Sequence, residues 1–163
     1  MFKESFAPRE YFTMLMENGH FPDAVRFLAH ALPKREAVWW AWICARRAGP
    51  GEPSDQLKAS LDATEAWITQ PNDEKCRAAM KAAEAAGVGT AAGCAGLAAF
   101  FSGESLAPPG AATIPPGPGL TAKAVSGAVI LAAVAAEPAT AQEKFRAFLE
   151  QGLDVVNRIQ LWR

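Results

Sequence analysis

Proline and glycine break this sequence into short stretches, and their spacing limits the chain to helices of moderate length. Within the stretches, apolar residues recur every three or four positions, which is the period of one face of an α-helix. Proline is tolerated in the first turn of a helix, and glycine is favoured just beyond the last turn. The breaks therefore mark helix ends, and they fall at Pro8, Gly19, Pro22, Pro33, Gly49, Pro53, Pro71, Gly87 and Pro138.

This pattern predicts an all-α protein, a compact bundle of seven or eight helices that forms a single domain over residues 1–163. The abundant alanine favours helix and lets neighbouring helices approach closely. Gly152 is a candidate break within the last helix. A repeat-like stack is the alternative architecture, but no residue pattern returns at a fixed period of about 30–45 residues.

The longest interruption is a connector at residues 103–119. Residues 105–119 contain five prolines and three glycines, which exclude helix and argue against a central strand. We expect this connector to lie at the surface and to run extended, partly as polyproline II. Segments of this kind also serve as ligands for aromatic grooves.

Three tryptophans lie within four positions of the predicted helix at residues 34–47. Trp40 falls on the apolar stripe and is expected in the core, whereas Trp39 and Trp42 fall on flanking faces. Half-exposed tryptophans are frequent anchors of protein interfaces, and basic residues at a helix C-terminus are favoured by its dipole. The predicted partner-binding residues are Trp39, Trp42, Arg46, Arg47, Pro115, Pro116 and Pro118.

Charge and cysteine content narrow the class of protein. The 16 basic and 17 acidic residues nearly cancel, and no concentrated basic region suggests nucleic-acid binding. Three widely spaced cysteines predict reduced thiols in helix interfaces rather than a disulfide framework. The first ten residues lack the pattern of a signal peptide, so we expect a cytoplasmic protein.

No catalytic, cofactor-binding or metal site is predicted. The two histidines, His20 and His30, have no partners at metal-ligand spacing, and the glycine-rich run at 87–93 lacks the lysine of a phosphate-binding loop. One alternative is an enzyme whose site joins His30, Arg47 and an acid through folding. A second alternative is a membrane-associated protein using residues 88–136, although its apolar segments are shorter than the ~20 residues of a transmembrane helix.

The run Lys-Arg-Glu-Ala-Val-Trp-Trp at 34–40, the proline-rich connector and the run Phe-Leu-Glu-Gln-Gly-Leu-Asp at 148–154 resemble an uncharacterised family of small helical bacterial proteins. The resemblance extends over residues 8–160. Members of that family are encoded near type VI secretion components, which implies an adaptor, chaperone or other accessory role. The resulting hypothesis is a non-catalytic protein–protein interaction module whose partner is a secretion effector or tip component.

Overall fold

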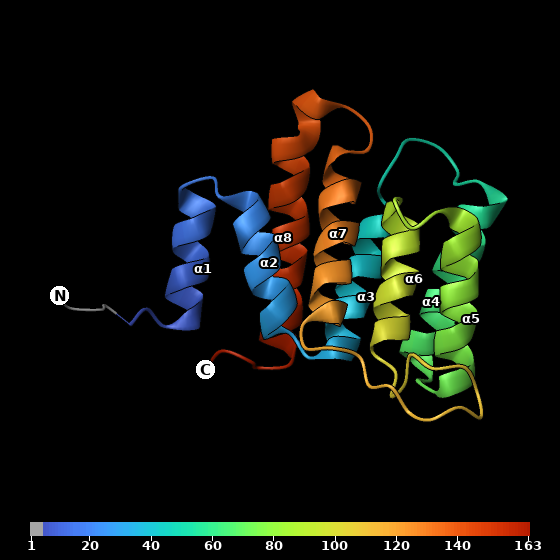
Figure 1. Cartoon of the computed structure of the whole chain (residues 1–163). Helices are drawn as coiled ribbons and strands as arrows, with labels where there is room; N and C mark the ends of the chain where they lie inside the picture. The colour runs from blue at the N-terminus through green and yellow to red at the C-terminus, as the bar shows by residue number, and fades with distance from the viewer. Residues whose placement is uncertain (1–4) are drawn as a thin grey trace.

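The computed structural model describes residues 5–163; residues 1–4, part of the segment on which the signal-peptide expectation rests, lie outside that range. The described residues form eight α-helices, one 3-10 turn and no strand, so the all-α prediction is confirmed (Figure 1). In chain order the elements are α1 (Pro8–Glu17), α2 (Phe21–Ala31), α3 (Lys34–Ala45), α4 (Asp55–Thr69), α5 (Asp73–Ala86), α6 (Ala91–Phe101), α7 (Leu120–Val134), η1 (Pro138–Thr140) and α8 (Ala141–Arg158).

Local signals determine where several of these helices begin. Ser54, Asn72 and Thr90 are the N-caps of α4, α5 and α6, and each side-chain oxygen accepts a hydrogen bond from the backbone N–H three residues later. Such bonds satisfy donors that a helix N-terminus otherwise leaves unpaired. α1 and α2 instead carry a proline in their first turn.

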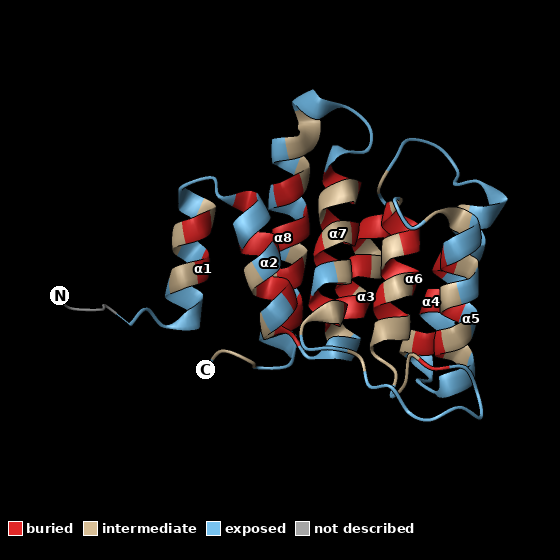
Figure 2. Ribbon diagram, in the orientation of Figure 1, coloured by how far each residue is buried: buried red, intermediate tan, exposed pale blue. Residues whose placement is uncertain are grey.

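From α3 the chain passes through α4 to α5 at one side of the molecule, and it then returns through α6 and α7 to α8 (Figure 1). On the return path α7 contacts α2, α3, α6 and α8, while α3 contacts α4, α6, α7 and α8. The buried residues lie on the facing sides of these helices (Figure 2). α3 is therefore central, which agrees with its unbroken apolar run at residues 37–45.

Trp40 and Gly152 join α3 to α8, and this contact corrects the expected break at Gly152. The helix continues through Gly152, which is buried. A Cβ atom there would collide with Leu28 Cδ2 and lie 2.8 Å from Trp40 Cε2. The Trp40 indole N–H donates to the Phe148 carbonyl at 2.7 Å. Gly152 thus provides room for a tryptophan and does not end a helix.

The connector lies largely at the surface, as predicted, but its first part does not run extended. The Leu106 N–H donates to the Ile114 carbonyl at 2.7 Å, which closes residues 106–114 into a loop. The Ser105 hydroxyl accepts hydrogen bonds from the N–H groups of Ala107 and Ile114. A serine side chain therefore replaces the missing backbone partners and turns the chain back on itself.

The apolar helices α6 and α7 pack against each other, and α6 also packs against α3, α4 and α5. Within residues 5–163, no single helix is long and apolar enough to cross a membrane. Leu120–Val134 and Pro138–Arg158 satisfy length and composition criteria together, but they are bent by 114° at their junction.

Candidate functional site: an apolar cleft beyond the C-terminus of α3

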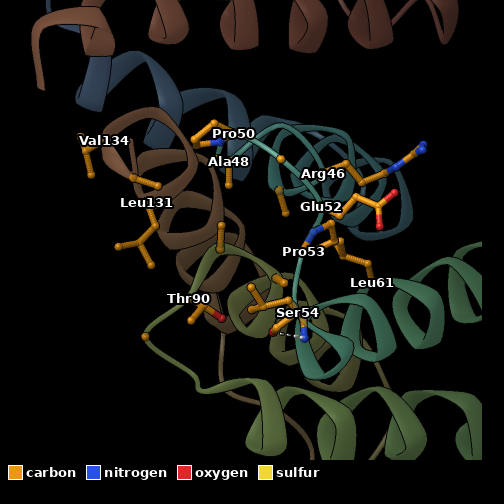
Figure 3. Close-up of a pocket in the computed structure, with 18 residues that line it drawn as sticks. Arg46, Ala48, Pro50, Glu52, Pro53, Ser54, Leu61, Thr90, Leu131 and Val134 are labelled. Atoms are coloured by element: carbon orange, nitrogen blue, oxygen red, sulfur yellow. Dashed lines mark hydrogen bonds between the residues drawn. The ribbon is translucent and has the colours of Figure 1, made fainter. Parts of the chain in front are cut away.

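An open cleft of about 440 Å³ lies where the C-terminal end of α3 meets α4, α6 and α7 (Figure 3). The α3–α4 loop borders one side, and the first residues of α6 and the last turn of α7 border another. Arg46 and Glu52 are the charged residues among those that line it. The lining residues are Ala45, Arg46, Ala48, Gly49, Pro50, Gly51, Glu52, Pro53, Ser54, Leu57, Leu61, Gly89, Thr90, Ala91, Ala92, Leu131, Val134 and Ala135.

Apolar side chains of the cleft and its surroundings remain in contact with solvent. Val134 at the end of α7 is 44% exposed, and Val88, next to the lining residue Gly89, is 50% exposed. Leu57 and Leu131 are half-buried. Large aliphatic side chains are usually buried in a core, so their grouping around a concave surface makes this cleft the candidate site.

The α3–α4 loop separates this cleft from a second hollow. Residues 49–53 make no hydrogen bond to another residue of the described chain. Gly49 and Pro50 line both the cleft and a hollow of about 570 Å³ that is bordered by Arg47, Glu137 and Lys144. A segment with few contacts and an exposed backbone has low local stability, so this wall of the cleft is the part most able to adjust.

Trp42 and Arg46 form one ordered unit at the rim. The Trp42 indole N–H donates to the Leu61 carbonyl on α4 at 3.0 Å, which fixes the ring between two helices. The guanidinium carbon of Arg46 lies 4.6 Å from the centre of that ring. A cation–π contact of this kind restrains the guanidinium without using its N–H groups as hydrogen-bond donors.

The structure brings together some of the predicted partner-binding residues and separates others. Arg46 lines the cleft with Trp42 against it, while Arg47 faces the second hollow. Trp39 is half-buried, with the guanidinium of Arg158 on α8 positioned 5.8 Å from its ring centre.

The connector prolines lie near the other end of α3. Pro116 and Pro118 line a hollow of about 250 Å³ with His30 and Lys34, and Pro115 is exposed. A helix of 12 residues is about 18 Å long. The prolines therefore do not share a surface with Arg46 and Arg47, and His30 does not meet Arg47 in the joint site that the enzyme alternative requires.

Sequence reasoning missed the aliphatic wall of the cleft, formed by Leu57, Leu61, Leu131 and Val134. Leu57 and Leu61 recur at helical spacing in α4, and that spacing by itself predicts only an apolar helix face. The available signal was weak, because an apolar residue at a helix end has the same pattern whether it faces a core or a cleft. Only the packing of four helix ends around one point distinguishes the two.

The polar groups of the cleft are few. No histidine or cysteine lines it, and no group of three potential metal-ligating side chains occurs in the described part of the chain. Cys44, fully buried in α3, has its pKa raised by burial, which is partly offset by Arg47. A neutral buried thiol is a poor nucleophile.

Fold and site together define a small all-helical protein with an open apolar cleft and a stacked arginine at its rim. By sequence, the chain belongs to a family of unknown function, DUF6931, whose model matches residues 11–156. The expected membership of an uncharacterised family is thereby confirmed. No curated protein and no solved structure matches this chain.

Proposed function

We propose that this protein is a protein-binding module and that the cleft beyond α3 receives apolar side chains of its partner. The observation that carries the proposal is the open apolar cleft of about 440 Å³, with Val134 and Val88 left exposed beside it. A partner that covers apolar surface of this kind removes it from water, and this burial stabilises the complex.

The extent of the apolar surface favours a macromolecular partner over a small metabolite. Small-molecule sites enclose most of their ligand and fix it with converging polar groups. Here the cleft is open, its aliphatic wall continues toward exposed Val134, and its charged lining residues stand at the rim. This arrangement, an apolar centre with a polar edge, is typical of protein interfaces.

The resemblance to proteins encoded near type VI secretion components supports a more specific form of this proposal. On that reading the protein is an adaptor, chaperone or other accessory protein, and its partner is a secretion effector or tip component. The adjustable α3–α4 loop suits such a role, because loop rearrangements on binding are over-represented among regulatory interactions.

A pull-down with two matched variants tests the proposal. Val134→Glu places a charge at the cleft, and Ile114→Glu places the same charge on the connector, where Ile114 is 57% exposed. Both sites are exposed, so both variants should keep the helical signal and the midpoint of thermal unfolding close to those of the wild type. We expect a protein captured from host lysate by the wild type and by Ile114→Glu to be lost with Val134→Glu.

Equal capture by the wild type and both variants would place the binding surface elsewhere and contradict the role of the cleft. Absence of any reproducible partner of the wild type would contradict the binding function itself. Identification of the captured protein by mass spectrometry tests the secretion role, which requires an effector or tip component.

A further inference from the structure

We infer that the partner segment recognised by the cleft carries a carboxylate next to its apolar anchor, and that Arg46 receives this carboxylate. The inference rests on the proposed function and adds the chemistry of the partner to it. An acidic–apolar peptide segment is the occupant that the charge and shape of the rim fit best.

Arg46 is held in place before any partner binds. Its guanidinium carbon lies over the Trp42 ring, 4.6 Å from the ring centre, and Trp42 is itself fixed by its hydrogen bond to the Leu61 carbonyl. A long flexible side chain normally loses rotamer freedom when it forms an ion pair. Because the contact with Trp42 has already restricted the Arg46 side chain, less conformational entropy is lost when a carboxylate binds.

Within residues 5–163, the Arg46 guanidinium has no hydrogen-bond acceptor and no ion-pair partner. The ion pairs within residues 5–163 are Arg26–Asp23 and Arg77–Asp73, and no oxygen of this range accepts a hydrogen bond from the Arg46 side chain. A planar guanidinium with free edge donors matches a carboxylate through two parallel hydrogen bonds. An apolar cleft beside it supplies the adjoining site for an aliphatic or aromatic side chain.

The start of α6 adds to the positive potential around Arg46. Ala91 and Ala92, at the start of α6, line the cleft, and the first turn of α6 contains no acidic residue. The positive end of the α6 dipole is therefore not offset by acidic side chains in that turn and adds to the field of Arg46. Both favour a negative group on the partner.

Glu52 is the group that opposes this preference. It extends from the same side of the cleft as Arg46 (Figure 3), and it belongs to the loop segment without hydrogen bonds, residues 49–53. Because Glu52 repels an incoming carboxylate, removing its charge should strengthen binding of an acidic segment. The inference thus predicts opposite effects for two neighbouring lining residues.

A peptide selection followed by binding measurements tests the inference. A library of random 12-residue peptides with amidated C-termini is selected on the wild-type protein and counter-selected on Val134→Glu. We expect enriched sequences to combine a large apolar residue with Asp or Glu within about four positions. Affinities of one such peptide, and of its analogue with Gln or Asn in place of the acid, are then measured by fluorescence anisotropy.

We expect the acidic peptide to bind Arg46→Gln about fivefold more weakly than the wild type and Glu52→Gln about twofold more tightly, with both differences reduced at high salt. Arg47→Gln is the matched control, because Arg47 is equally basic but lines the second hollow, and its affinity should equal that of the wild type. The neutral analogue should not distinguish Arg46→Gln from the wild type.

Enriched peptides that lack acidic residues, or an acidic peptide that binds Arg46→Gln as well as the wild type, would overturn this inference and leave the proposed function standing. Enrichment of basic peptides that depend on Glu52 would overturn it as well. Failure to enrich any peptide relative to Val134→Glu would contradict the role of the cleft in the proposed function.

Discussion

The contact of α3 with α8 and the contact of α6 with α5 bring helices together in opposite ways. At the first, Trp40 inserts its ring against Gly152, and its indole donates to a carbonyl of α8. At the second, Gly96 lets α6 approach so closely that an added Cβ would lie 2.9 Å from the Ala79 carbonyl oxygen and 2.9 Å from Ala83 Cβ. One contact depends on a large side chain, and the other depends on having none.

This difference predicts that the two contacts are sensitive to opposite kinds of substitution. A contact filled by one large side chain fails when that side chain is truncated, because a cavity remains. A contact made by close backbone approach fails when a side chain is added, because the helices must separate. Both regions are fully packed, yet the same substitution to alanine damages them by different mechanisms.

The largest expected effect is that of Trp40→Ala. Trp40 is fully buried, and its removal leaves a cavity and a lost hydrogen bond to the Phe148 carbonyl. We expect a loss of about 3–5 kcal/mol in the free energy of unfolding, measured by urea denaturation. The half-buried neighbour Trp39 is the control, and Trp39→Ala should cost much less. A loss below ~1 kcal/mol for Trp40→Ala would show that this contact does not hold α3 and α8 together.

Gly96→Ala should have the second-largest effect on the free energy of unfolding. Alanine improves intrinsic helix propensity by about 1 kcal/mol, but its Cβ would press on the backbone of α5, which cannot rotate away. We expect a net loss of about 1–3 kcal/mol in the free energy of unfolding.

Gly127→Ala on α7 is the matched control for Gly96→Ala, because the nearest atom to its added Cβ is Cys94 Sγ at an ordinary 3.4 Å. This variant should be neutral or more stable by up to ~1 kcal/mol. Equal effects at the two glycines would mean that close approach of α6 to α5 is unimportant.

Trp42→Phe is expected to cost about 1–2 kcal/mol, since it keeps an aromatic ring next to Arg46 but removes the hydrogen bond to the Leu61 carbonyl and some of the packing of the indole. Thermal or urea unfolding measures the loss. If the variant costs as much as Trp40→Ala, the ring of Trp42 is part of the core and not a support for the rim.

The smallest effect concerns the thiols. Burial raises the pKa of Cys44 and of half-buried Cys94, so both are protonated at pH 7 to 8, and only Cys94 is partly accessible. Reaction with a disulfide reagent requires the thiolate. We expect slow labelling at Cys94 that accelerates as the pH rises, and labelling of Cys44 only at the rate of unfolding. Labelling of native Cys44 as fast as Cys94 would show that α3 is not buried as described.

The sequence by itself determined the secondary structure and the place of the central helix. Proline, glycine and the caps at Ser54 and Asn72 act over three or four residues, so their effect can be read from the chain without knowledge of its neighbours. The apolar composition of α3 likewise requires burial on nearly every side. The burial of Trp40, with Trp39 and Trp42 on half-buried flanks, followed from helical spacing alone.

Tertiary structure decided the roles of Gly152, the connector and the site. A glycine in the sequence can mark either the end of a helix or a place where another residue packs closely against the backbone. At Gly152 only the position of Trp40 on α3 shows that the second case applies. The cleft is assembled from the ends of four helices, which belong to three separate segments of the chain, 45–61, 89–92 and 131–135. Of the predicted partner-binding residues, only Arg46 lines it, with Trp42 packed against Arg46. Short-range patterns fix helices, because backbone hydrogen bonds within a helix are local; a site depends on long-range packing, which no local pattern specifies.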